Sequence, residues 1–241
     1  MLGLAQCTVA GLDVGMHFQR FVFSKEPARL QCELLSRPSG GLGVEDFLAG
    51  LSTDQHLDLL TFQLQVKERL AAAVGMSTTI NIHNSVVESV AHRDRFLQIV
   101  ADYPAPTVFE FTETYPMPPV GVSNRLMRDL RELGHQSALD DFGIGLTGMS
   151  LLTDYDFDVV KIDRTLICDI DTRVEKYKTL LLVRQILTVL GKDHVVEGVE
   201  SKEVLEMLAE AGFNTFQGFL FDRPSSVENL LTEAREMESV A

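Results

Sequence analysis

Eight short apolar runs alternate with longer amphipathic stretches along this chain of 241 residues, and this alternation limits the folds it can adopt. The runs are rich in Val, Ile, Phe and Thr and are too short for helices, which is typical of β-strands. The expected strands cover residues 18–23, 30–35, 78–83, 108–112, 137–140, 159–162, 194–197 and 215–219.

The stretches between these runs show helical periodicity with recognisable ends. One apolar stripe covers residues 57–74, follows Ser52 and Gln55 in the spacing of a capping box, and is followed by Gly75. Two further stripes, at 180–190 and 204–208, end before Gly191 and Gly212.

Eight strands with about seven helices between them predict an α/β fold of the (β/α)₈ TIM-barrel type, in a single domain covering residues 1–241. An open, doubly wound sheet gives the same pattern strand by strand and stays open as the alternative. Only about six residues separate the first two strands, too few for a crossover helix. The first strand is therefore expected to pair antiparallel with the second.

Charge and cysteine content limit the partners and the compartment. Lys and Arg number 21 against 35 Asp and Glu, and the formal charge of −14 repels nucleic-acid backbones and anionic lipid. We expect no DNA, RNA or membrane binding, and no stretch is apolar enough to span a bilayer. Cys7, Cys32 and Cys168 lack metal-ligand spacing and suit a reducing cytoplasm.

A polar residue interrupts nearly every expected strand or follows it directly. If the strands are parallel, these side chains converge at the carboxyl end of the barrel, where the active sites of this architecture lie. A single such residue is as easily a satisfied core polar group, but seven strands with the same feature indicate a site. The residues are Glu33, Asn81, Glu110, Asp140, Asp141, Lys161, Glu197 and Gln217.

Carboxylates gathered in a low-dielectric mouth repel one another, and bound cations relieve that repulsion. Carboxylate and amide oxygens, with no His or Cys, suit Mg²⁺ or Mn²⁺. The adjacent Asp140 and Asp141 could bridge two ions about 4 Å apart, an arrangement that supports phosphoryl transfer. Lys161 would hold the attacking water and offset negative charge, or else form a structural salt bridge.

A competing motif lies directly after the two aspartates. Residues 143–148 have the form G-x-G-x-x-G, and Asp163 follows at the distance typical of a dinucleotide-binding fingerprint. Asp140 and Asp141 would repel a pyrophosphate there, and the motif follows the fifth strand instead of opening the first βα unit. The dehydrogenase interpretation is therefore disfavoured.

Taken in order, these motifs resemble those of the EAL family of cyclic di-GMP phosphodiesterases over about residues 16–224. The family's Glu-Ala-Leu corresponds to Glu33-Leu34-Leu35, with Leu34 in place of Ala. The other motifs that carry the resemblance are Phe18-Gln19-Arg20-Phe21-Val22, Ile80-Asn81-Ile82, Glu110-Phe111-Thr112-Glu113, Asp140-Asp141-Phe142-Gly143, Lys161-Ile162-Asp163, Glu197-Gly198-Val199-Glu200 and Gln217-Gly218.

The resemblance implies a barrel with an antiparallel first strand and hydrolysis of cyclic di-GMP to linear pGpG at a two-metal Mg²⁺ or Mn²⁺ site. It places Glu33, Asn81, Glu110 and Asp140 on one ion and Asp140 and Asp141 on the other. Lys161, Glu197 and Gln217 would order water. These three residues and Glu33 would be the catalytic groups. Substrate contacts would come from Gln19, Leu35, Arg37, Asp163 and Glu200. Glu113 would anchor the loop after Asp141, which lies near a homodimer interface in this family.

Two functions fit this pattern. Every ligand position holds a competent residue, which favours an active phosphodiesterase. Leu34 and the altered loop at 143–148, where Ile144 and Leu146 replace common Thr and Tyr, favour the alternative. In that alternative the chain is a weak or inactive EAL domain that acts as a cyclic di-GMP receptor or a protein-binding regulator.

Overall fold

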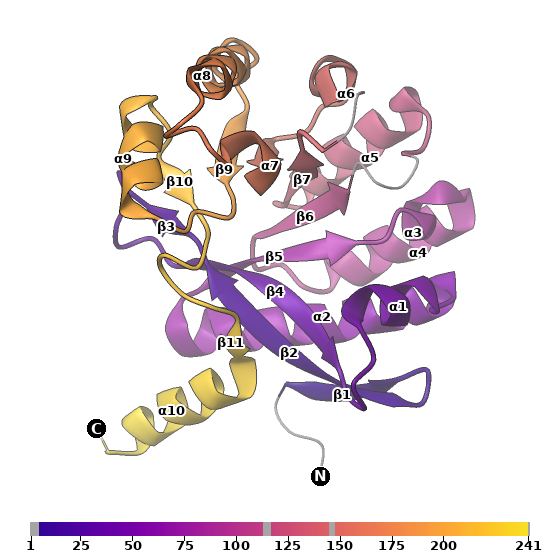
Figure 1. Ribbon diagram of the computed structural model, residues 1–241. Helices are drawn as coiled ribbons and strands as arrows, with labels where there is room; N and C mark the ends of the chain where they lie inside the picture. Colours follow the sequence, from indigo (N-terminus) through magenta and orange to yellow (C-terminus); the bar gives the residue numbers. More distant parts are fainter. Residues whose placement is uncertain (1–4, 113–116, 145–147, 241) are drawn as a thin grey trace.

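The computed structural model describes residues 5–112, 117–144 and 148–240 and contains one mixed sheet with helices around its outer side (Figure 1). The strands are β1 (Gln6–Val9), β2 (Leu12–Arg20), β3 (Val22–Phe23), β4 (Gln31–Pro38), β5 (Ser77–Ile82), β6 (Thr107–Thr112), β7 (Gln136–Phe142), β8 (Val159–Ile162), β9 (Asp193–Val196), β10 (Thr215–Phe216) and β11 (Ser225–Ser226). The helices are α1 (Val44–Ala49), α2 (Thr53–Val74), α3 (Ser85–Glu88), α4 (Val90–Ala101), α5 (Val120–Glu132), α6 (Gly148–Asp154), α7 (Arg164–Ile167), α8 (Val174–Val189), α9 (Lys202–Glu210) and α10 (Val227–Val240).

Strands β4 to β10 lie side by side in chain order, and each pairs parallel with the next. A doubly wound sheet would reverse its strand order at a switch point, so this sequential order excludes that alternative and confirms the TIM-barrel type. The hydrogen-bonded ladder is not continuous around the barrel. It is interrupted at Phe21, where the chain passes from β2 to β3.

The antiparallel first strand is confirmed, and it is divided into two parts. β2 pairs antiparallel with β4, and β3 pairs antiparallel with β10 at the other end of the parallel series. One segment thereby contacts both ends of that series. The six-residue connection between Phe23 and Leu30 contains a turn with a hydrogen bond from the Arg29 amide to the Glu26 carbonyl, which leaves no room for a crossover helix.

Helix ends follow local signals in the sequence. Ser52 caps α2, and its hydroxyl accepts from the Gln55 amide while the Gln55 side chain accepts from the Ser52 amide. Gly75 ends this helix in the left-handed conformation, at φ +66°. The Ser201 hydroxyl caps α9 in the same way. None of the described helices combines the length and apolarity needed to cross a membrane.

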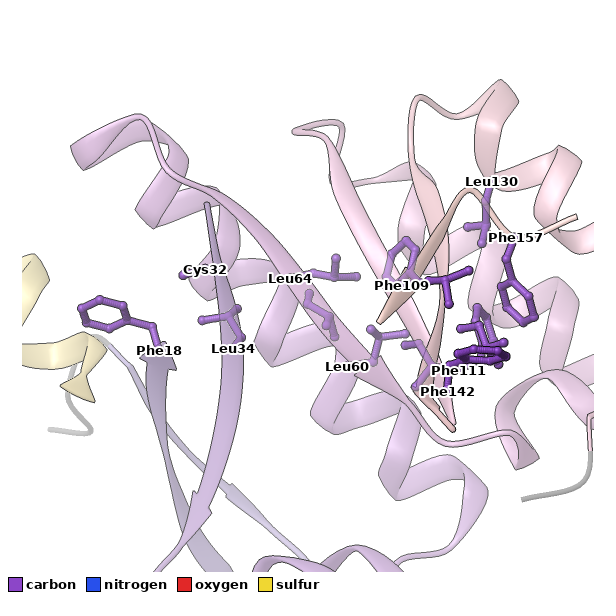
Figure 2. Packing of buried hydrophobic residues seen from close by; sticks show 14 of the residues in the cluster. Phe18, Cys32, Leu34, Leu60, Leu64, Phe109, Phe111, Leu130, Phe142 and Phe157 are labelled. Carbon is purple, nitrogen blue, oxygen red and sulfur yellow. The ribbon is translucent and has the colours of Figure 1, made fainter. Parts of the chain in front are cut away.

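Strand alternation separates an outer core from the interior of the barrel. In β6, Phe109 and Phe111 are fully buried and pack outward among the helices, in the large core of which Figure 2 shows a part. Val108, which directly precedes Phe109 on β6, belongs to a second, smaller cluster inside the barrel. Because side chains alternate across a strand, Glu110 also points inward. Each buried Phe contributes about 1.5–3 kcal/mol to holding this register.

Several elements at the ends of the chain were not anticipated. β2 begins at Leu12 instead of residue 18, and its first residues form a hairpin with β1. Further along β2, His17 and Phe18 pair antiparallel with β11. The last strand ends at Phe216 instead of residue 219, because the chain turns at Gly218. Glu113 and residues 145–147, which the sequence pattern assigned to loop anchoring and a dimer interface, lie outside the described residues.

Candidate metal centre and active site

The Lys161 ammonium is the centre of a buried charged layer at the carboxyl end of the strands. This side chain on β8 is 2% exposed. Its Nζ atom lies 2.9 Å from Glu110 Oε2, 2.9 Å from Asp140 Oδ1, 2.8 Å from Glu197 Oε1 and 3.6 Å from Glu33 Oε2. Four carboxylates on four other strands or strand ends therefore meet at one cation. Burial alone would lower the pKa of Lys161, but these carboxylates raise it well above its usual value.

Glu33 is held as a carboxylate by three neighbours. Asn81 Nδ2 donates to its Oε1 at 2.8 Å, and Gln217 Nε2 donates to its Oε2 at 3.0 Å. Burial would raise the pKa of Glu33, but the charge of Lys161 and these two hydrogen bonds outweigh it and keep the pKa below its usual value. The residue is thus ionised and fixed in position.

Glu110 and Glu197 have raised pKa values, in contrast to Glu33. Burial, reinforced by the charges of Glu33 and Asp140, raises the pKa of Glu110 well above its usual value despite Lys161. The same causes raise the pKa of Glu197 to about 8. Glu110 is 1% exposed, and its Oε1 has no hydrogen-bond partner among the described residues. A buried carboxylate oxygen without a partner is costly, and a cation would satisfy it.

Asp140 and Asp141 reach the same mouth although they are adjacent on β7. The register between β7 and β8 shifts between Leu139 and Phe142, and Asp141 has a φ of +60°. This irregularity cancels the normal alternation of side chains. As a result, oxygens of Asp140, Asp141 and Glu197 lie within 4.8 Å of one another. An all-oxygen donor set with this spacing fits Mg²⁺ or Mn²⁺.

A cavity of about 470 Å³ adjoins the metal-binding side of the layer. Asn81, Glu110, Asp140 and Asp141 line one side of it, and the other walls are mainly apolar side chains of β4, α1 and α2. Leu35 and Arg37, for which the resemblance implies substrate contacts, also line it. Arg37 donates to the Ser36 carbonyl and forms no ion pair within the described part of the chain, so its charge is available to an anion.

The remaining substrate candidates lie on the other side of the mouth. Gln19, Glu200 and Gln217 line a smaller hollow of about 180 Å³, with Phe219 on its edge. Gln19 Nε2 donates to the Asp222 carbonyl at 3.1 Å. Asp163 is not among the residues that line this hollow. Its side chain caps α7 and accepts from the Thr165 amide at 2.8 Å.

Two residues at this mouth, Arg164 and Asp222, were not identified from the sequence, and a third, Gly218, was identified only as part of the Gln217-Gly218 motif. Arg164 pairs with Glu200 at 3.0 Å and lines the smaller hollow. Asp222 pairs with Arg20 at 2.7 Å. A Cβ atom at Gly218 would lie 2.1 Å from the Val199 carbonyl oxygen, so only glycine allows this close approach beside Gln217. In the sequence, the glycine after Gln217 was a signal of this close approach, whereas nothing in the sequence indicates the two arginine–carboxylate ion pairs.

Comparison with known proteins agrees with this geometry. The family model of the EAL domain matches residues 9–224. The chain belongs to the EAL domain family. It is 30% identical to the cyclic di-GMP phosphodiesterase RocR of Pseudomonas aeruginosa, over 92% of this chain and 61% of that protein. It is 31% identical to the cyclic di-GMP phosphodiesterase NbdA of the same organism, over 69% of this chain and 21% of that protein.

This EAL chain therefore spans less than two thirds of the curated relatives that it matches. Among solved structures, a standalone EAL protein from Vibrio cholerae O395 in its c-di-GMP bound form superposes with a TM-score of 0.75 at 27% identity, covering 90% of this chain and 94% of that chain. The EAL domain protein of Listeria monocytogenes EGD-e gives a TM-score of 0.79 at 23% identity, covering 91% and 92%. These matches establish the EAL fold for this chain.

Proposed function

We propose that this EAL domain hydrolyses cyclic di-GMP to linear pGpG with Mg²⁺ or Mn²⁺ as cofactor. The observation that carries the proposal is the Glu110 carboxylate, buried at the mouth of the barrel with one oxygen unpartnered among the described residues. It lies beside the Asp140, Asp141 and Glu197 cluster. Two relatives are named as cyclic di-GMP phosphodiesterases, which supports cyclic di-GMP as the substrate.

The residues fit two metal ions. Glu33, Asn81, Glu110 and Asp140 would hold one, and Asp140 and Asp141 the other. When bound, such ions supply a hydroxide nucleophile and stabilise the charge of an in-line phosphoryl displacement. Asp140 is shared because it lies at the strand end, next to the irregularity that turns Asp141 to the same side.

The protein's own groups divide the remaining work. Lys161 stays protonated, since the carboxylates around it raise its pKa, and it offsets negative charge and donates to the water or to a phosphate oxygen. Glu197 lies 2.8 Å from Lys161, and with a bound cation lowering its raised pKa it would be ionised and would accept a proton from water. Gln217 fixes Glu33 through its 3.0 Å hydrogen bond and orders water beside it.

Substrate positioning follows from the two hollows. Arg37, which forms no ion pair among the described residues, clamps a phosphate, and Leu35 closes the wall of the larger cavity, where apolar side chains accept a base. Gln19 and Glu200 position the other half of the substrate in the smaller hollow, with Asp163 orienting the loop at the start of α7. A homodimer formed through the loop after Asp141 stays a prediction.

The test is incubation of the purified protein with cyclic di-GMP and Mn²⁺, with the products resolved by chromatography. We expect linear pGpG, and its loss in Glu33→Gln, which keeps the shape of Glu33 but removes its charge. Tight nucleotide binding with no turnover would refute catalysis and support the receptor alternative.

A further inference from the structure

A second cavity, of about 440 Å³, opens at the amino end of the barrel, opposite the proposed active site. Its lining includes the first residue of five parallel strands, which fixes it at that end: Gln31, Gln136, Val159, Asp193 and Thr215. Active sites of this architecture lie at the carboxyl end, so the proposed function makes no use of this cavity.

The cavity exists because the side chains inside this half of the barrel are small. Barrel interiors are usually filled by layers of bulky, branched side chains. Here Ala138 and Thr79 take two of the inward positions, and the space continues upward to Glu110 and Lys161. Its volume lies within the range of about 300–1,000 Å³ of ligand pockets.

Two buried polar groups line this cavity without partners. Thr79 is 3% exposed and His194 is 7% exposed, and neither Thr79 Oγ1 nor His194 Nε2 has a hydrogen-bond partner in the described ranges. Burial and the charges of Arg184 and Lys25 lower the pKa of His194 to about 4, so its imidazole is neutral. Such groups cost free energy unless a ligand or water pairs with them.

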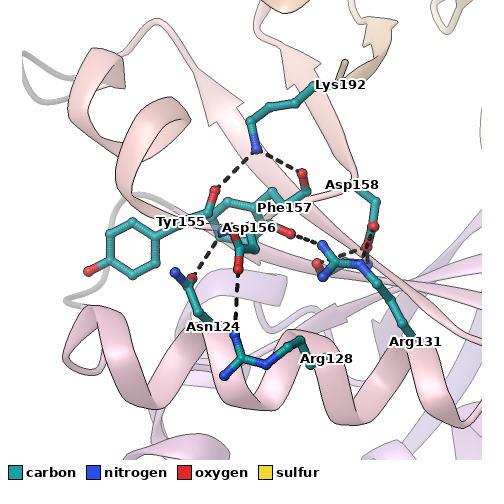
Figure 3. Close-up of polar contacts among 9 residues, drawn as sticks. Asn124, Arg128, Arg131, Tyr155, Asp156, Phe157, Asp158 and Lys192 are labelled. Carbon is teal, nitrogen blue, oxygen red and sulfur yellow. Dashed lines mark hydrogen bonds and ion pairs between the residues drawn. The ribbon is translucent and has the colours of Figure 1, made fainter. Parts of the chain in front are cut away.

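Positive charge gathers at the mouth of this cavity in a chain whose net charge is −14. Lys25, Arg29, Arg184 and Lys192 line it, against the acidic side chains of Glu26 and Asp193 and, at the inner end, Glu110. Within the described part of the chain, Lys25 forms no ion pair. Arg184 donates to a backbone carbonyl and a threonine hydroxyl, and Lys192 donates to the two backbone carbonyls drawn in Figure 3. Arg29 Nη1 lies 3.9 Å from Glu26 Oε1, whereas the other three cations form no ion pair among the described residues, which leaves them able to attract an anion.

We propose that this amino-end cavity binds a small phosphorylated ligand with a flat heteroaromatic body, of the nucleoside monophosphate class. The phosphate lies at the cationic mouth, where Lys25, Arg29 and Arg184 line the cavity. Phe21 and Phe23 offer aromatic walls to a ring. Thr79, which points into the barrel, pairs with a polar atom of the ligand, which a purely apolar tail would leave unsatisfied.

Calorimetric titration with AMP and with GMP, in buffer containing EDTA, tests this site without any use of catalysis. We expect one binding site whose affinity falls as salt rises. Lys25→Glu reverses an exposed charge that has no ion pair, and it should weaken binding about fivefold or more. Lys178→Glu, which makes the same charge change on α8 away from the cavity, should leave binding unchanged. Val108→Phe fills the interior and should abolish binding.

A melting curve shows whether Val108→Phe still folds, and Lys25→Glu carries the test if it does not. No heat of binding for either nucleotide at millimolar concentration overturns the proposal. So does binding that survives Val108→Phe and Lys25→Glu but is lost in Arg37→Ala, because that result places the nucleotide in the substrate cavity at the opposite end.

Discussion

Replacement of Lys161 by Met gives the sharpest test of the charged layer. This change keeps most of the side-chain volume and removes the one cation that four carboxylates share. With an effective dielectric constant near 20, each contact at 2.9 Å corresponds to about 6 kcal/mol of attraction before desolvation is subtracted. Desolvation and mutual repulsion of the carboxylates remove most of this, and breaking a buried pair typically costs about 3–5 kcal/mol.

We therefore expect Lys161→Met to lower the free energy of unfolding by about 3–5 kcal/mol at pH 8 in EDTA. The loss should be smaller at pH 5.5, because Glu110 and Glu197, whose pKa values are already raised, take up protons and no longer repel. Mn²⁺ should also reduce the loss, since it replaces the missing positive charge. Urea unfolding at both pH values, with and without Mn²⁺, measures each effect.

Lys67→Met is the matched control. Lys67 is 1% exposed and is held by the carbonyls of Tyr103 and Ala105 and by Glu68, far from the metal centre. Its loss should destabilise the protein by a comparable amount, with no rescue by Mn²⁺. Equal losses for Lys161→Met at pH 5.5 and pH 8, or a loss that Mn²⁺ leaves unchanged, would refute the assignment of this layer as a carboxylate and metal site.

Four further predictions rest on the same geometry. Glu197, with a pKa of about 8, is roughly nine-tenths protonated at pH 7, and the pKa of Glu110 is raised as well, so Mn²⁺ binding should release one proton or more. Calorimetry in two buffers of different ionisation enthalpy measures this release, and none at all contradicts the assignment. Because that pKa is raised above its unfolded value, the metal-free protein should also lose stability as pH rises from about 5 to about 8, as melting curves can show. Asp141→Asn keeps the positive φ, which asparagine tolerates, but should weaken Mn²⁺ binding about tenfold or more; unchanged affinity removes Asp141 from the ligands. Gly218→Ala should cost about 1–3 kcal/mol or more in urea unfolding, because its Cβ meets Val199, whereas Gly121→Ala in open helical space should cost nothing.

The strands and the polar layer could be predicted because both signals are local. One inward polar residue per strand marks the carboxyl end of each βα unit, as Glu110 between Phe109 and Phe111 illustrates. The capping box at Ser52 is equally local. The antiparallel first strand followed from the length of one connection, which is a limit on chain reach and needs no tertiary information.

Other features depend on contacts that the sequence does not display. The early start of β2 is an exception among the features that were missed, because the sequence does show it: Leu12, Val14, Met16 and Phe18 alternate with other residues. By contrast, the contact of Lys161 with four carboxylates depends on side-chain conformations across separate strands. The amino-end cavity likewise depends on small residues from different strands meeting at one level of the barrel.

The central claim is metal-dependent hydrolysis, and one measurement tests it most directly. Protein stripped with EDTA is given cyclic di-GMP, and pGpG is quantified by chromatography before and after Mn²⁺ is restored. We expect no product in EDTA and turnover once Mn²⁺ is present. Substrate that stays intact with Mn²⁺, in protein whose binding of the ion is verified by calorimetry, would contradict it.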